Sequence, residues 1–191
     1  MKRIALLMTG CALCAALAAE EIALPKPQTS GGMPLADALA QRKTTRKWSD
    51  RPLPMETVSS LLWAAWGVTR PDGKRTAPTA MNRQEYTLYA AIPSGIYRYD
   101  AAENKLVQVS PERYGDAPLT VILVADLEKQ REKFAWVDGG FIGQNIYLFC
   151  AANHLATVFR ARFDNEAVTK LLKLGKGSEA LFVQAVGFPA E

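Results

Sequence analysis

The sequence predicts an α+β domain in which a β-sheet is flanked by helices. Segments with helical periodicity and short β-rich segments interleave along the chain, without a regular strand–helix–strand rhythm. The continuous apolar run Leu119–Ala125 is typical of a central strand that is covered on both faces. About 155 residues follow the N-terminal segments, and that length suits one domain with its own core.

The first 19 residues have the pattern of a secretory signal peptide. Lys2 and Arg3 precede a mostly apolar run, Ile4–Leu17, which is shorter than the ~20 residues of a membrane span. Ala16-Leu17-Ala18 matches an A-x-A cleavage site. We therefore expect an exported, periplasmic protein.

The signal peptide sets the expected domain boundaries. Residues 20–34, which contain the sequence PKPQTSGGMP, are expected to be a linker, and residues 35–191 the folded domain. An alternative is a lipoprotein signal in which Cys11 is acylated and tethers the protein to the membrane.

Cysteine, histidine and charge content argue against several classes of function. Cys150 is the one cysteine beyond the signal segment, so neither an internal disulfide nor a cysteine metal cluster is expected. His154 is the one histidine, which argues against a histidine metal site or a Ser-His-Asp hydrolase. The formal net charge of +4, half of it from Lys2 and Arg3, is too small to predict nucleic-acid binding.

Periodicity predicts the individual elements. Helices are expected at Leu35–Gln41, Met55–Trp66, Leu127–Lys133, Phe141–Asn153 and Glu166–Leu174, the last ending at Gly175. Strands are expected at Tyr86–Ile92, Ile96–Tyr99, Leu106–Val109, Leu119–Ala125, Ala156–Ala161 and Leu181–Val186, the second and third of them as a hairpin.

The most informative stretch is a basic segment that follows the first predicted helix. Four cations and two threonines alternate in Gln41-Arg42-Lys43-Thr44-Thr45-Arg46-Lys47-Trp48. Arginine offers a planar fork of donors that matches phosphate oxygens, and threonine adds a hydroxyl donor. The segment is therefore a candidate phosphate site, although cations that decorate a helix end would give the same pattern.

Three further polar segments are candidates for ligand contacts. The loop at residues 75–84 contains Pro78, Thr79 and Asn82, which could position hydrogen bonds to a flat, heteroatom-rich ligand. Two glycines at residues 139 and 140 are expected to open a helix that is apolar nearly all round and needs cover from its own domain or a partner subunit. Arg160 and Arg162 leave a predicted strand on the same side.

Together these segments resemble the FMN-dependent nitroreductase family, in particular its short branch grouped with SagB-type dehydrogenases. The likeness covers residues 24–189, and it rests on four blocks in the family's order. They are Leu35-x-x-Ala-Leu-x-x-Arg42-Lys-Thr-Thr-Arg46, Leu61-Leu-Trp-Ala-Ala-Trp-Gly67 leading to Arg75-Thr-Ala-Pro78-Thr79, Gly140-Phe-Ile-Gly-Gln144-Asn145-x-Tyr-Leu, and Thr157-Val-x-Arg160 with the terminal Val186-Gly-Phe-Pro189.

The resemblance implies a homodimer with a mixed sheet and FMN bound at the subunit interface. The family's phosphate-binding motif, Arg-x-Ser-x-Arg/Lys, corresponds to Arg42, Thr44 and Arg46, with Lys43 contributing through its backbone or ammonium group. The loop that contacts the ribityl chain and isoalloxazine corresponds to Pro78, Thr79 and Asn82. The turn that faces flavin N5 corresponds to Ala161 and Arg162.

The resemblance also implies an activity, namely ping-pong hydride transfer through flavin N5 to or from a small organic substrate such as a nitro compound, a quinone or a heterocycle. The electron donor would be NAD(P)H or an unidentified periplasmic reductant, and no protein nucleophile is expected. Many members carry a C-terminal Lys/Arg pair at the phosphate that residues 187–191 lack, so Arg160 or Arg162 is expected to replace it. Alternatives are a non-catalytic flavin- or small-ligand-binding protein on the same fold and a membrane-tethered structural lipoprotein.

Overall fold

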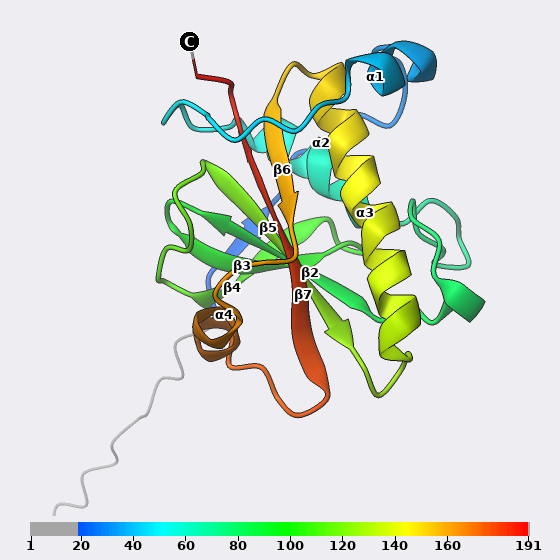
Figure 1. Cartoon of the computed structure of the whole chain (residues 1–191), viewed down its shortest axis with the longest axis vertical. Coiled ribbons are helices and arrows are strands. Elements are labelled where there is room, and N and C mark those ends of the chain that lie inside the picture. Colours follow the sequence, from blue (N-terminus) through cyan, green and yellow to red (C-terminus); the bar gives the residue numbers. More distant parts are fainter. Residues whose placement is uncertain (1–18, 191) are drawn as a thin grey trace, which may run out of the picture.

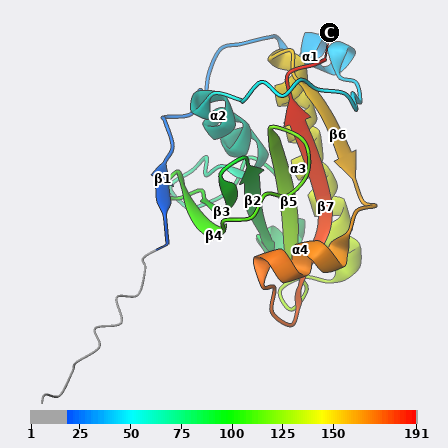
Figure 2. The ribbon, with the colours of Figure 1, turned by 90° about the vertical axis from the view of Figure 1, so that its left-hand side faces the viewer.

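A seven-stranded antiparallel sheet forms the centre of the molecule (Figure 1). The computed structural model describes residues 19–190; residues 1–18 of the expected signal peptide, Cys11 among them, and Glu191 lie outside the described residues. The strand order is β1-β4-β3-β2-β5-β7-β6, so that β1 and β6 form opposite edges of the sheet, as Figure 2 shows. The strands are β1 (Glu21–Ala23), β2 (Tyr86–Ile92), β3 (Gly95–Asp100), β4 (Lys105–Ser110), β5 (Leu119–Asp126), β6 (Ala156–Arg160) and β7 (Ser178–Gly187).

Helices cover both faces of this sheet. They are α1 (Leu35–Gln41), α2 (Met55–Trp66), α3 (Glu132–Ala152) and α4 (Asn165–Leu172), with a short 3-10 turn η1 (Ala80–Asn82) before β2. On one face, α2 and α3 form the main core with Leu88, Val121 and Leu123. On the other face, α4 packs Val168 and Leu172 against Ile122 and Val124. Consecutive residues of β5 thus enter different cores, which confirms the predicted doubly covered strand.

The α+β class is confirmed, and most predicted elements are present. Both N-terminal helices have their predicted bounds, and β3 pairs with β4 as the predicted hairpin. The expectation of a mixed sheet is wrong, because every strand pairing within residues 19–190 is antiparallel.

Three helix predictions need correction. Residues 127–130 are not helical, because the Asp126 carboxylate accepts the backbone N–H groups of Glu128 and Lys129 and closes a turn instead. Helix α3 begins at Glu132 and not at Phe141, so the glycines lie inside the helix and do not open it. Helix α4 ends before Gly175, because Lys173 already adopts a left-handed conformation with φ of 51°.

Part of the segment that the sequence suggested as a linker joins the packed domain. Residues 21–23 form β1 and pair with residues 105–107 of β4. The Asn104 amide then donates to the carbonyl oxygens of Leu24 and Pro25, and the Ser59 hydroxyl donates to Pro25. These bonds attach the chain before α1 to α2 and to the outer strands of the sheet.

Helix α3 approaches the sheet closely because two of its residues have no side chain. A Cβ atom on Gly139 would lie 2.5 Å from the Phe182 ring, and one on Gly143 would lie 2.6 Å from the Phe159 ring. Gly140 lies between them and faces open space. The glycines therefore serve close helix–sheet packing at residues 139 and 143.

The outer face of α3 is apolar and uncovered in the single chain. Trp136, Val137 and Phe141 are 42%, 54% and 43% exposed, although the opposite face of the helix is fully buried. No helix among residues 19–190 is both long enough and apolar enough to span a bilayer. The sequence predicted that this helix is packed on several sides. Within residues 19–190 of the single chain, other elements pack against one side only.

We expect Gly143→Ala to lower the free energy of unfolding by about 1–3 kcal/mol, because its Cβ would overlap the Phe159 ring. Gly140→Ala is the matched control in the same helix, and it should be neutral or gain up to about 1 kcal/mol of helix propensity. Urea denaturation measures both. Equal stability of the two variants would contradict the packing role.

Candidate functional site

The basic segment after α1 runs along the edge of the sheet. The Thr45 amide donates to the Thr157 carbonyl of β6, and the Ser49 amide donates to the Phe188 carbonyl. Trp48 also forms a β-bridge with Pro189. In Figure 1 the segment leaves α1 and passes the ends of β6 and β7. Residues 42–48 are therefore held in an extended conformation beside the edge strand β6, which they partly cover.

The phenol of Tyr147 on α3 fixes this segment from the side. Its oxygen is 2.9 Å from the Thr44 hydroxyl oxygen and accepts the Phe159 amide at 3.1 Å. The Arg42 guanidinium lies 5.2 Å from the centroid of the Tyr147 ring, within the range of a cation–π contact. One side chain thus links the basic segment, α3 and β6.

Within the described residues, the cations of this segment have no carboxylate partner. The ion pairs within residues 19–190 are Lys74–Asp72, Lys105–Glu21 and Lys129–Asp126, and none includes Arg42, Lys43 or Arg46. Lys43, Thr44 and Arg46 are exposed, and Arg42 is half-buried. Unneutralised cations beside a fixed hydroxyl form an electrostatic environment that favours an anion.

A cavity of about 540 Å³ borders the basic segment. Its lining includes Lys43, Thr45 and Tyr147, together with His154 and Thr157. Its volume lies within the range of small-molecule sites, roughly 300–1,000 Å³. Among residues 19–190, the cavity lining contains cationic and hydroxyl groups and no carboxylate.

Arg160, Ala161 and Arg162 lie where β6 ends. Both arginines line a second, smaller cavity of about 280 Å³ with Tyr114 and Asp116. The Arg160 guanidinium lies 5.9 Å from the centroid of the Trp48 ring. The structure therefore brings Arg160 to the Trp48 end of the basic segment, whereas Arg42 and Thr44 contact Tyr147.

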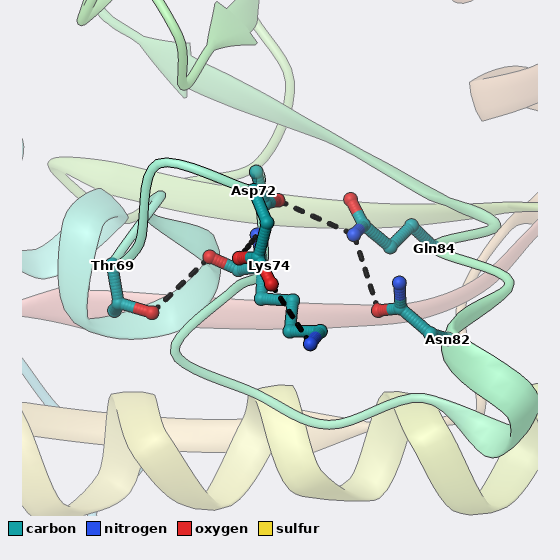
Figure 3. Close-up of polar contacts among 6 residues, drawn as sticks. Thr69, Asp72, Lys74, Asn82 and Gln84 are labelled. Atoms are coloured by element: carbon teal, nitrogen blue, oxygen red, sulfur yellow. Dashed lines mark hydrogen bonds and ion pairs between the residues drawn. The ribbon is translucent and has the colours of Figure 1, made fainter.

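The candidate ligand loop, residues 75–84, is bound to itself by polar contacts. The Thr79 hydroxyl accepts the Gln84 amide at 3.0 Å, and the Asn82 side-chain oxygen accepts from the Gln84 side chain at 3.2 Å. The Gln84 side-chain amide also donates to the Gly73 carbonyl. This bond joins the loop to the turn that contains Asp72 and Lys74 (Figure 3). Pro78 and Asn82 are exposed at its surface.

The ligand loop is anchored on α3. The Ala80 amide donates to the Asp138 carboxylate at 2.9 Å, and the Ala80 carbonyl accepts from the Gln130 side chain at 3.0 Å. Glu85 is buried at the start of β2, and burial together with the neighbouring Asp138 raises its pKa to about 7.

The two candidate segments attach to different parts of α3. Thr44 contacts Tyr147, and Ala80 contacts Asp138. Nine residues of helix separate these contact points, a distance of about 14 Å along the axis. The exposed Phe141 lies on this stretch, and the exposed Val137 directly precedes it. The phosphate candidates and the ring-contact candidates are therefore attached at opposite ends of this stretch of α3.

Three residues of this arrangement were missed from the sequence. Tyr147 belongs to a block that carried the family resemblance, but nothing in its spacing assigned it a contact with Thr44. Asp138 stands in an otherwise apolar context, and a buried acid in such a context is a signal that sequence reading can use, whereas Glu85 follows the polar residues 82–84 and gives no such signal. Their proximity, however, depends on the packing of α3 on β2.

Comparison with known proteins decides the family. The model of the nitroreductase family matches residues 39–188. The chain belongs to the nitroreductase family. A crystal structure from Ralstonia eutropha, provisionally named a nitroreductase, is 32% identical with a TM-score of 0.85, and the match covers 90% of each chain. The protein has the nitroreductase fold.

Relatives with lower sequence identity are consistent with this family assignment. A protein from Methanocaldococcus jannaschii, provisionally named a nitroreductase, is 25% identical over 73% of this chain and 84% of its own. A structure from Clostridium acetobutylicum, provisionally named an NADH oxidase, shares the fold with a TM-score of 0.59 at 22% identity, covering 81% of this chain and 89% of that one. Family membership supports an oxidoreductase that acts on small molecules.

We expect Tyr147→Phe to destabilise the protein by about 1–2 kcal/mol, because the Phe159 amide and the Thr44 hydroxyl each lose a hydrogen-bond partner. Amide hydrogen exchange of residues 42–48 should accelerate in this variant. Thr44→Val is the control that removes only one of the two bonds, and it should have the smaller effect. Unchanged exchange in Tyr147→Phe would contradict the anchoring role.

Proposed function

We propose that this protein is an FMN-dependent oxidoreductase of the nitroreductase family. The observation that carries the proposal is the basic segment, in which Arg42 and Arg46 form no ion pair within residues 19–190 and Thr44 bonds Tyr147, while the chain is held against β6. Alternating residues of an extended chain point to the same side, so these three side chains can converge on one phosphate. Lys43 adds positive charge and lines the adjoining cavity.

The other candidate residues fit the rest of the cofactor. Thr79 and Asn82 offer polar groups beside the rigid Pro78, and the backbone at Ala161 and Arg162 is exposed at the end of β6. Bound FMN would supply hydride chemistry at flavin N5 in a ping-pong cycle. The chain's own residues would bind the phosphate, orient the ring and place cationic or amide groups where negative charge develops.

A homodimer would complete the site. The resemblance to the family implies FMN at the subunit interface, so we propose that residues 78–82 of a second copy contact the flavin bound at Arg42 and Thr44. The exposed apolar stripe of Trp136, Val137 and Phe141 runs from just before the Asp138 contact toward Tyr147 and would be buried by that copy. The proposed dimer therefore explains the uncovered face of α3.

The substrate proposed is a small organic molecule such as a nitro compound, a quinone or a heterocycle, as in the SagB-type branch. We propose the periplasm as the location, because residues 1–19 have the pattern of a signal peptide. The electron donor would then be NAD(P)H or a periplasmic reductant. N-terminal sequencing of the periplasmic fraction, with mass spectrometry for acylation at Cys11, tests cleavage and the lipoprotein alternative.

We expect protein from Ala19 onward to retain FMN after removal of free ligand, with a flavin visible spectrum. Arg42→Ala and Arg46→Ala should each weaken binding by about 10- to 100-fold, the effect of losing a charge-assisted hydrogen bond. Arg70→Ala, an exposed arginine in a remote turn, is the control for net charge.

The spectrum separates the proposals. Flavin that binds but is reduced by neither NADH nor NADPH, although dithionite reduces it chemically, would favour the non-catalytic binding protein. A folded dimer that retains no flavin would contradict the enzyme function.

We expect Phe141→Asp to shift the protein from dimer to monomer and to weaken FMN retention at the same time, because a charge on the α3 stripe opposes apolar burial. Sedimentation velocity at micromolar concentration measures the change. Lys170→Asp, on α4 at the opposite face of the sheet, is the control. A Phe141→Asp variant that stays dimeric would place the interface elsewhere.

A further inference from the structure

Two acidic side chains are buried together beneath the ligand loop. Glu85 at the start of β2 is 2% exposed, and Asp138 on α3 is 1% exposed. Acidic residues are seldom buried to this extent without a cationic partner. Neither residue takes part in any of the ion pairs within residues 19–190.

The hydrogen bonds of the pair are unequal. Asp138 accepts the Ala80 amide at 2.9 Å, whereas neither Glu85 side-chain oxygen has a partner among residues 19–190. Burial raises the pKa of Glu85 from its ordinary value of 4.5 to about 7, and the neighbouring Asp138 carboxylate contributes to the rise. A proton on Glu85 can satisfy one of its oxygens by donation to Asp138, and it removes the repulsion between two buried charges.

The loop above this pair is held in an unfavourable backbone conformation. Met81, Asn82 and Gln84 all have positive φ, between 47° and 56°, which is uncommon for residues other than glycine. Such conformations persist only where surrounding contacts impose them. At Ala80 the loop is held from outside by two hydrogen bonds: the Ala80 amide donates to the Asp138 carboxylate, and the Ala80 carbonyl accepts from the Gln130 side chain.

We propose that Glu85 and Asp138 are positioning residues, which share one proton and thereby hold Pro78–Asn82 in the geometry that its ligand contacts require. With the proton present, Asp138 accepts both the Ala80 amide and the Glu85 hydroxyl. With the proton lost, two adjacent buried carboxylates repel each other, and Asp138 or Glu85 must move toward water. The loop is then released from α3.

Other titratable groups surround the pair without neutralising it. The Tyr86 phenol, from β2, donates to the Ala135 carbonyl of α3, and burial together with Glu85 and Asp138 raises its pKa. Arg75, from the loop, donates to Gln84 and to the Trp66 carbonyl, and the charges that act on it are those of Tyr99 and Asp100. Asp126, whose amide donates to the Glu85 carbonyl, forms its ion pair with Lys129.

The direction of the pH effect follows from the raised pKa of Glu85. Since the closed loop binds the proton more tightly than an open one, closure is most favourable below pH 4.5 and is lost as the pH rises toward 7. The closing equilibrium changes by up to about tenfold per pH unit in this window and levels off above it.

The test is amide hydrogen exchange of residues 79–84 between about pH 5 and pH 8, corrected for the intrinsic rate, on protein without FMN. Wild-type protection should fall at least about tenfold across this range. In Glu85→Gln, residues 79–84 should stay protected both at about pH 5 and at about pH 8, because the glutamine amide donates to Asp138 without titrating. Glu85→Ala should likewise lose the pH dependence, because Asp138 still accepts the Ala80 amide and no second buried carboxylate repels it.

Infrared spectroscopy supplies an independent signature. Wild type should show a carboxylic acid C=O band that disappears as the pH rises through about 7. Glu85→Gln should lack this band, and Glu103→Gln, at an exposed glutamate, should keep both the band and the pH-dependent exchange. Protection of residues 79–84 that does not vary with pH in wild type, or that varies equally in Glu85→Gln, would overturn the proposal. Neither readout involves flavin, so failure here is distinct from failure of the proposed function.

Discussion

The close packing of α3 on the sheet is the constraint on which the other features depend. Gly139 and Gly143 bring the helix against Phe182 and Phe159, because no side chain separates them. At that distance Tyr147 reaches the Phe159 amide and Asp138 reaches the Ala80 amide. A helix held farther from β6 and β2 could make neither bond, so the same packing positions the basic segment and the ligand loop.

The two ends of this helix have opposite electrostatic character. Near Tyr147, the exposed Lys43 and Arg46 and the half-buried Arg42 have no carboxylate partner in the described part of the chain, so an anion gains their interaction at small desolvation cost. Near Asp138, two acids are buried and lack cations, so a proton is the simplest way to reduce their charge. One region of the molecule is thus suited to bind an external anion, and the other to retain a proton of its own.

The apolar stripe of α3 runs from just before Asp138 toward Tyr147 and connects these regions to quaternary structure. Val137 and Phe141 are exposed in the single chain although the neighbouring Ile142 is fully buried. A second copy on this stripe would exchange apolar exposure for contact area and would bring its own ligand loop toward the basic segment. Chain packing, cofactor binding and dimerisation would then depend on the same helix.

By itself the sequence determined the local elements and the family. Helices α1 and α2 and strand β2 follow from periodicity, since the residues that define them are neighbours in the chain, and the ordered blocks identified the nitroreductase family. The tertiary structure decided what depends on distant residues. It placed Glu21–Ala23 in the sheet, extended α3 through its glycines, joined Thr44 to Tyr147 and brought Glu85 to Asp138. A contact across many residues depends on how elements pack, and no local pattern contains that information.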